Sequence, residues 1–329
     1  MIFAAVVSAF ALGLGSPHPV QVQTPTQPPS RTDPSTSTLP DVEVIGRPTR
    51  EAVREFVGRV AAPSMGRGLA RWRAELCPGV ANLDPAASQA IVDRITSTAA
   101  GLGIRTGEPG CKANLVVIFT DDGTGLTQAL VARDRHVFRQ NFSGLDRGAA
   151  AFRDFQTTER PVRWWSLSVA IDSRTGQRAF RMPGDPTGVK VDPAVASALG
   201  CEPDDCGIGA APMLVRDGAS RLNTQIVDDL YKTIIIVDVD LIGQVNTSQL
   251  GDYLAFIGLA QIDSEADTTG FDTVLNLFSG GNQDGLTEWD RSYLSAIYAA
   301  RSERVSSAAQ ASAVADIMTR DRLADGRRQ

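Results

Sequence analysis

The stretch TIIIVDVDLI at residues 233–242 decides the fold class of this chain. A nearly continuous run of β-branched and aliphatic residues is typical of a strand that is buried in a sheet. The stretch NLVVIFT at residues 114–120 is similar and ends at the turn-forming Asp-Asp-Gly of residues 121–123. It predicts a central buried strand.

Apolar residues at helical spacing surround these strands. Thr49 caps one predicted helix, which Pro63 ends, and a second covers residues 86–102. Their predicted core residues are Val53, Phe56, Val57, Val60, Ile91, Ile95 and Ala99. Further patterns predict strands at 76–83 and 162–171 and helices at 126–133, 145–156, 248–259 (capped by Thr247 or Ser248) and 287–301 (opened by Thr287 with Asp290). The order predicts an α/β (α+β) fold, a mixed twisted sheet packed with helices and followed by a helical C-terminal part.

The two ends of the chain differ in composition from the middle. Residues 1–15 are typical of a signal peptide whose basic n-region is missing, which favours a true start upstream, and its apolar core is shorter than the ~20 residues of a spanning helix. Residues 16–40 form a Pro/Thr/Gln-rich linker. We expect one domain at 41–303, with an irregular insertion at 173–220, and an Ala-rich helix or tail at 304–329. The mature chain is expected to be periplasmic or secreted, without a transmembrane anchor.

Charge and cysteine content agree with this organisation. The chain of 329 residues has a net charge of -6, which argues against nucleic-acid binding. Its four cysteines favour disulfides in an oxidising compartment, Cys77 with Cys111 and Cys201 with Cys206, although three pairings are open. A zinc site is disfavoured because no Cys-x-x-Cys spacing occurs and histidine is scarce.

Few residues are candidates for catalysis. His136 could act as a general base, but the neighbouring Arg133, Arg135 and Arg139 would lower its pKa, and no Gly-x-Ser-x-Gly motif is present. A solvated helix end explains the same residues. Asp238 and Asp240 share one face of their strand and could form a paired-carboxylate site, or could be salt-bridged structural acids.

Two acidic loops resemble calcium loops in part. Asp263, Glu265 and Asp267 alternate, but Thr268 and Val274 stand where a calcium loop has its glycine and its closing glutamate. The second partial set is Asn282, Asp284 and Glu288. Turn formation and helix capping explain both loops as well, so calcium is kept only as a possible cofactor and no other is expected.

Three further segments have two readings each. The pairs around Trp164-Trp165 and Arg71-Trp72-Arg73 could be stacking platforms for a sugar or peptide, but alternation in a strand sends Trp164 and Trp165 to opposite faces and favours a core position. Residues 41–46 look like the short box by which outer-membrane receptors engage TonB. An ordinary edge strand fits them equally.

The last hundred residues contain an ordered series of motifs. The strand at 234–242 leads into the helix at 248–259, which ends in Ile257-Gly258-Leu259. Thr273-Val274-Leu275 follows, and then a helix opened by LTEWD at 286–290. This order resembles the catalytic half of the zincin metalloproteases of matrixin type, in which a strand leads to a His-Glu-x-x-His helix, a Gly-Leu turn, a third histidine, a methionine turn and a final helix. It is also similar to a family of exported proteobacterial proteins of unknown function.

The resemblance lacks the metal ligands of that family. Aligning the Gly-Leu turn places Gly251, Asp252 and Ala255 at the first histidine, the glutamate and the second histidine, and Gln261 at the third histidine. Glycine and alanine cannot coordinate zinc, so no activated water forms. The resemblance therefore implies a protein without catalytic or metal residues that binds an extended peptide or envelope protein by strand addition. The alternative is an active hydrolase that uses His136 or an acidic metal site of Asp238, Asp240 and Asp252.

Overall fold

The computed structural model describes residues 49–64, 67–138, 147–176, 225–281, 283–303 and 306–325. Several sequence predictions lie outside these residues: the leader, the linker, the segment 41–46, most of the insertion at 173–220, and the pairing of Cys201 with Cys206.

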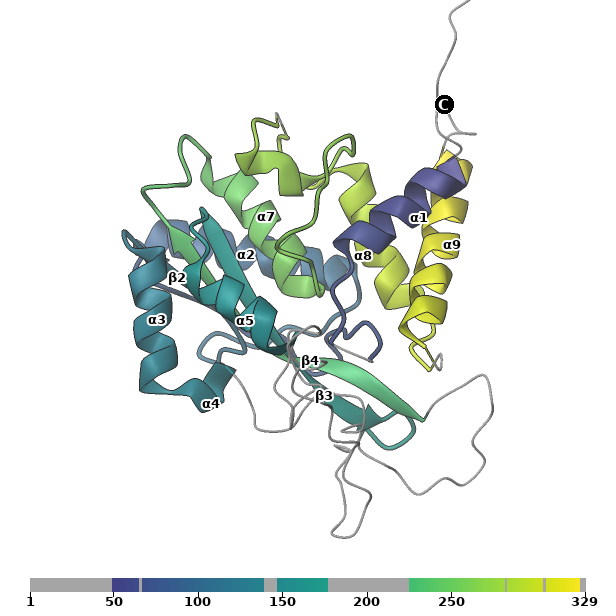
Figure 1. The fold of residues 1–329 in the computed structure, drawn as a ribbon, viewed down its shortest axis with the longest axis horizontal. Coiled ribbons are helices and arrows are strands. Elements are labelled where there is room, and N and C mark those ends of the chain that lie inside the picture. Colours follow the sequence, from purple (N-terminus) through teal and green to yellow (C-terminus); the bar gives the residue numbers. More distant parts are fainter. Residues whose placement is uncertain are drawn as a thin grey trace, which may run out of the picture. The chain divides into compact units, whose positions relative to one another are not determined.

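The described chain is built around one sheet with strand order β1-β2-β4-β3 (Figure 1). Its strands are β1 (Pro78–Ala81), β2 (Leu115–Thr120), β3 (Val162–Asp172) and β4 (Ile226–Asp238). The first two and β4 run parallel, and β3 pairs antiparallel with β4 at one edge. The prediction of β2 as an interior strand is confirmed.

Helices cover both faces of this sheet, which confirms the mixed α/β class. On one face the sheet packs on α2 (Pro85–Gly101) and α7 (Thr247–Leu259), and the same core extends to α1 (Thr49–Val60), α8 (Glu288–Ala299) and α9 (Ser307–Asp325). The other packs on α3 (Gly123–Arg133), α4 (Arg135–Phe138) and α5 (Gly148–Thr157). Because side chains alternate along a strand, Ile235 and Val237 of β4 enter the first core, and Ile234 and Ile236 enter the second.

The two tryptophans of β3 follow the same alternation. Trp164 packs in the first core and Trp165 in the second, and both are buried. Trp72 is also buried, and its Nε1 donates to the carbonyl of Gly258, 2.8 Å away. The core reading of these residues is therefore confirmed, and none of the three is an open stacking platform.

The bounds of β4 differ from the prediction. The strand begins at Ile226, because residues 226–232 pair with β3, and it ends at Asp238. There the chain turns: the amides of Leu241 and Ile242 both donate to the Asp238 carbonyl at 3.2 Å. The apolar residues of 239–242 thus lie in a turn, and Val239 and Leu241 are exposed.

The helix that follows, α7, is buried along its whole length after the first turn. Asn246 is its N-cap, instead of the predicted Thr247 or Ser248, and forms a capping box with Gln249. At the other end Gly258 lets the helix approach β2, since a Cβ there would lie 2.6 Å from Leu115 Cδ1. The helix therefore packs against the sheet, as the sequence predicts.

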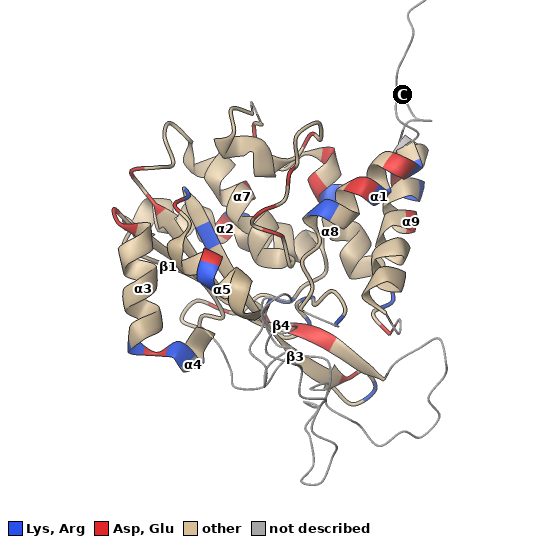
Figure 2. Ribbon diagram, in the orientation of Figure 1, with Lys and Arg blue, Asp and Glu red and all other residues tan. Residues whose placement is uncertain are grey.

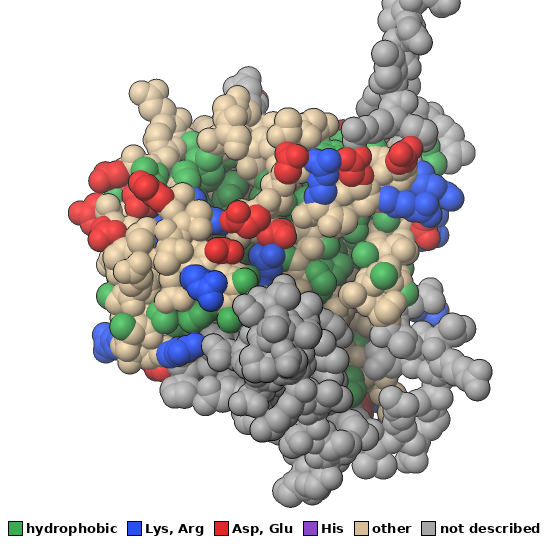
Figure 3. Space-filling view, in the orientation of Figure 1, with side chains coloured by type: hydrophobic (Ala, Val, Ile, Leu, Met, Phe, Trp, Pro, Cys, Tyr) green, Lys and Arg blue, Asp and Glu red, His purple; other side chains and the backbone are tan. Residues whose placement is uncertain are grey.

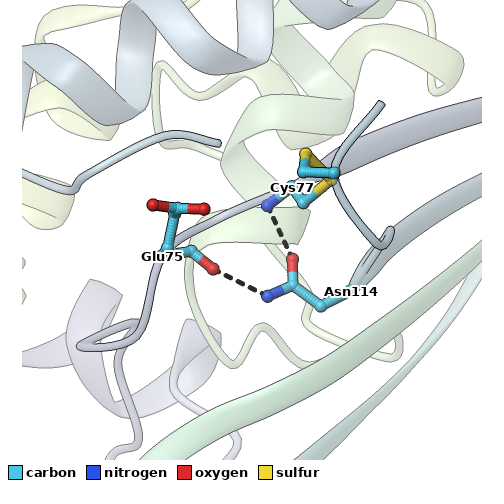
Figure 4. Close-up of a disulfide and its surroundings, with 4 residues drawn as sticks. Glu75, Cys77 and Asn114 are labelled. Carbon is cyan, nitrogen blue, oxygen red and sulfur yellow. Dashed lines mark hydrogen bonds between the residues drawn. A yellow bond between two sulfur atoms is a disulfide. The ribbon is translucent and has the colours of Figure 1, made fainter. Parts of the chain in front are cut away.

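A disulfide precedes β1, and a capping box opens α8. The predicted disulfide between Cys77 and Cys111 is present, and Asn114 bridges the chain beside it by accepting from the Cys77 amide and donating to the Glu75 carbonyl, both at 2.8 Å (Figure 4). The capping box of Thr287 with Asp290 opens α8, as predicted. The Ala-rich end forms α9, and no helix within the described ranges is long and apolar enough to cross a bilayer.

Candidate functional site

A groove with a volume of about 410 Å³ opens at the β3 edge of the sheet. Four segments line it: the residues that lead from α5 into β3, the middle of α7, the loop after α7, and η1 (Val274–Phe278) with Ser279. The lining residues are Thr158, Glu159, Arg160, Pro161, Val162, Trp164, Tyr253, Asp263, Ser264, Glu265, Ala266, Asp267, Thr268, Thr269, Leu275, Asn276, Phe278 and Ser279. The groove therefore has a polar rim and an aromatic wall.

The aromatic wall consists of three rings. Trp164 and Tyr253 meet edge to face with their centroids 6.3 Å apart, and Tyr253 and Phe278 do so at 4.9 Å. The indole of Trp164 is fixed further because its Nε1 donates to the Ile262 carbonyl at 3.0 Å. Edge-to-face contacts of this kind hold aromatic side chains in one arrangement, so the wall is rigid.

Tyr253 carries the one polar atom of this wall that has no protein partner among the described residues. The side chain is only 5 % exposed, and its hydroxyl makes no hydrogen bond within the described part of the chain. Burial raises the pKa of Tyr253 well above its ordinary value, so the phenol stays protonated and can donate. A hydroxyl of this kind can form one more hydrogen bond when a ligand supplies an acceptor.

The unpaired edge of β3 runs beside the groove. The amide of Asp238 donates to the Pro161 carbonyl at 2.9 Å, which makes these two a hydrogen-bonded pair. Bonded and non-bonded pairs alternate in antiparallel strands, so the backbone groups of Val162, Trp164 and Ser166 point away from β4. No other strand of the described residues pairs with this edge. An extended chain could add there.

The loop after α7 is fastened by three arginines from different parts of the fold. Arg147 contacts Asp263 at 2.9 Å, Arg160 bonds to Glu265 and to the Ser264 carbonyl, and Arg59 contacts Asp267 at 3.2 Å. Figure 2 shows acidic positions, in red, along the loop that runs beside α7. Every carboxylate of the first predicted calcium loop thus has an arginine partner.

The opposite wall of the groove is positioned by one buried carboxylate. Asp290 accepts from the Thr273 hydroxyl and from the Val274 amide, and so joins the start of η1 to the start of α8. Burial raises the pKa of Asp290, while its hydrogen bonds act in the opposite direction. The start of η1, which stands where the zincin-like order would have its methionine turn, is therefore held in position by hydrogen bonds to the buried Asp290.

The positions aligned with zincin ligands do not form one cluster. Gly251 and Asp252 both face α2: a Cβ on Gly251 would lie 3.1 Å from the Arg94 side chain, and the Asp252 carboxylate bonds to Arg94 and to the Leu286 amide. Ala255 is fully buried in the first core. Gln261 accepts from the Ala70 amide at 2.8 Å. None of the four lines the groove.

The other predicted candidates are also dispersed. Asp238 accepts from the amides of Gly123 and Asp240 at the end of β4 and shares none of these partners with Asp252, which bonds to Arg94 and to the Leu286 amide. His136 belongs to α4, and its side chain lies outside the described part of the structure, as does Asn282. No group of three His, Cys, Asp or Glu side chains among the described residues is placed to hold a metal ion.

No family model, curated protein or solved structure matches this chain. The site is therefore interpreted from its own geometry.

Sequence reasoning missed the residues that matter most in this groove, Tyr253, Phe278 and Glu159. They lie in three separate segments of the sequence, and no motif connects them. The available signal was weak: Tyr253 is the only side chain with a hydroxyl in the apolar second half of α7. It directly follows Asp252, which faces Arg94 of α2 and not the groove.

Proposed function

We propose that this chain is a non-catalytic, zincin-like protein of the bacterial envelope that binds an extended segment of a peptide or protein in the groove between β3 and α7. The hydroxyl of Tyr253, which has no hydrogen-bond partner among the described residues and belongs to a groove-lining side chain only 5 % exposed, is the observation that carries this proposal. A ligand backbone or side chain would supply the hydrogen-bond acceptor that the protein does not.

Two features of the groove suit an extended chain. The backbone groups of Val162 and Trp164, which line the groove and point away from β4, offer the donors and acceptors on which strand addition depends. Of the three rings of the wall, Phe278 is only partly buried and offers contact area for a ligand side chain, and Trp164 and Tyr253 hold it in place from behind. The order of strand, helix, turn and closing helix supports the zincin-like assignment, and the disulfide of Cys77 with Cys111 supports export to an oxidising compartment.

The test is a binding measurement with a library of fluorescent, extended peptides. Tyr253→Phe removes only the hydroxyl, and we expect it to weaken binding roughly two- to ten-fold, which corresponds to the loss of one net hydrogen bond. Tyr293→Phe is the matched control, because Tyr293 is also a buried tyrosine without a hydrogen-bond partner, but it lies in the core and not in the groove. Equal binding by both variants would count against the groove.

The alternative function, a hydrolase with an acidic metal site or His136, makes a different prediction. Peptide cleavage that chelators abolish, or that His136→Ala abolishes, would overturn the non-catalytic assignment. Metal analysis of the purified protein should accompany the assay, since a stoichiometric transition metal would be equally decisive.

A further inference from the structure

The charges that face the groove are unequal in sign and in exposure. Among its lining residues Glu159, Asp263, Glu265 and Asp267 are acidic, and only Arg160 is basic. The charge of Arg160 is paired with Glu265 and its side chain is only 13 % exposed, so it offers little to an anionic ligand. The rim of the groove is therefore acidic in effect.

The ion pairs of the loop do not cancel this acidity toward the solvent. The side chain of Asp267 is 69 % exposed, against 35 % for its partner Arg59. Glu265 is 58 % exposed, against 13 % for Arg160. In these two pairs the carboxylate is the more exposed partner, while Arg147 and Asp263 are about equally exposed. On the face drawn in Figure 3, acidic side chains gather near the middle of the molecule, with basic ones beside them.

Two of these carboxylates are suited to a second partner. Glu159 makes no ion pair with any described residue, and it stands at the entrance to β3. Hydrogen bonds from Thr269, followed by the charge of Arg59, hold the pKa of Asp267 below its ordinary value. Asp267 therefore keeps its negative charge in mildly acidic solution.

Resting on the proposed function, we infer that the occupant of the groove is a basic peptide, an extended segment with lysine or arginine at alternate positions. The cationic groups meet Glu159 and the loop carboxylates at the rim. Their methylene stems lie against Phe278, the partly buried ring of the aromatic wall, as long basic side chains do on apolar surfaces. Alternate spacing follows from an extended backbone beside β3, which sends every second side chain to the same face.

The experiment compares three labelled heptapeptides in which serine alternates with lysine, glutamine or glutamate, by fluorescence anisotropy at low and at physiological salt. We expect the lysine peptide to bind most tightly and the glutamate peptide most weakly. The preference should shrink as salt is raised, because exposed charges are screened. Glu159→Gln and Asp267→Asn should each weaken the lysine peptide roughly two- to five-fold and leave the glutamine peptide unchanged.

Glu108→Gln is the control, since it removes one exposed acidic charge that does not line the groove. The results separate the two levels of the proposal. Equal affinity for the lysine and glutamine peptides, with both weakened by Tyr253→Phe, would overturn the inference and leave the proposed function standing. Binding that Tyr253→Phe does not affect in any of the three would overturn the proposed function itself. If Glu159→Gln weakened the binding of all three peptides equally, the charge of Glu159 would have no role in selecting the lysine peptide.

Discussion

Asp252 shows how a single residue can be misread from its position in a motif. Its carboxylate is 1 % exposed and joins α7 to α2 through Arg94, with a further bond from the Leu286 amide at 3.0 Å. The hydrogen bond to Asp252 is also what raises the pKa of Arg94 above its ordinary value. The residue that sequence alignment placed at a catalytic base is thus a structural ion pair between two helices.

Removing Arg94 tests this interpretation. Arg94→Ala leaves the Asp252 carboxylate buried with the Leu286 amide as its remaining partner, and we expect the free energy of unfolding to fall by about 2–4 kcal/mol. Arg94→Lys keeps the charge and should lose less. Urea denaturation of the three proteins measures the difference. A fall of less than about 0.5 kcal/mol in Arg94→Ala would mean that the pair is no stronger than one on the surface.

Asp229 gives the structure a pH dependence. Burial raises the pKa of Asp229 to about 6, although the charges of Arg73 and Arg71 oppose this. The folded state therefore binds the proton more tightly than the unfolded state, whose pKa is near 3.8. The resulting stabilisation is complete below that value and is lost as the pH rises through about 6.

Asp229→Asn abolishes this titration. We expect the stability of the wild type relative to the variant to decrease as the pH is raised from about 4 to about 7, in urea denaturation at constant salt. Glu108→Gln, which removes an exposed carboxyl, serves as the background. An unchanged difference across this range would show that Asp229 titrates as an ordinary carboxyl.

At the scale of elements, α7 has the central position. It packs on both α2 and the sheet. Its C-terminal carbonyls are bonded by side chains from outside the helix: Gly258 by the Trp72 indole, and Leu259 by the Tyr298 hydroxyl at 2.7 Å. Helix ends that are buried require such partners. The position of α7, and with it the position of Tyr253 in the groove, therefore depends on close packing around Gly258.

Two Gly→Ala substitutions test this packing, one at a crowded helix position and one at an open helix position. Gly258→Ala places a methyl group 2.6 Å from Leu115 Cδ1, and we expect a loss of about 1–3 kcal/mol in the free energy of unfolding. Gly58→Ala in α1 meets nothing within 4 Å and should stabilise the protein by roughly 0.5–1 kcal/mol, because alanine is the better helix former. Thermal or urea denaturation distinguishes the two. Stabilisation by both substitutions would show that the Leu115 side chain of β2 can move to make room for a methyl group on α7.

At the scale of the whole molecule, one sheet with helices on both faces brings distant segments together. The groove is assembled from residues between Thr158 and Ser279, and its loop is fastened by Arg59 from α1. The disulfide of Cys77 with Cys111 spans 34 residues and encloses β1 and α2, the partner of α7. In the folded state this bond lies next to β1, the edge strand at the other end of the sheet from β3. In the unfolded state it restricts the conformations of the chain.

Loss of this disulfide should reduce stability without altering the groove. We expect Cys77→Ala with Cys111→Ala to lower the free energy of unfolding by about 2–4 kcal/mol, since the cross-link no longer restricts the unfolded state. Urea denaturation provides the measurement, with the wild type in reducing buffer as a second route to the same state. Peptide affinity under native conditions should stay unchanged. An unaltered unfolding curve would mean that the bond does not form in solution.

The elements of this protein follow from the sequence because their signals are local. Residues 114–120 contain only apolar residues between two polar ends, and Val53, Phe56, Val57 and Val60 recur at helical spacing, so β2 and α1 could be placed without the fold. The cysteine pair could be predicted for a similar reason, from two positions beside predicted strands. The end of β4 could not, because Val239 to Ile242 are apolar, and only the hydrogen bonds to Asp238 show that they turn.

Only the tertiary structure decided which residues face the groove. The second half of α7 is apolar around its whole circumference, so its hydrophobic pattern has no preferred direction and contains no information on rotation about the helix axis. Packing against α2 and the sheet sets that rotation, turning Gly251 and Asp252 toward Arg94 and Tyr253 toward β3. The sequence by itself determined the strands, the helices and the mixed α/β class, because those depend on neighbours along the chain. The site depends on neighbours in space.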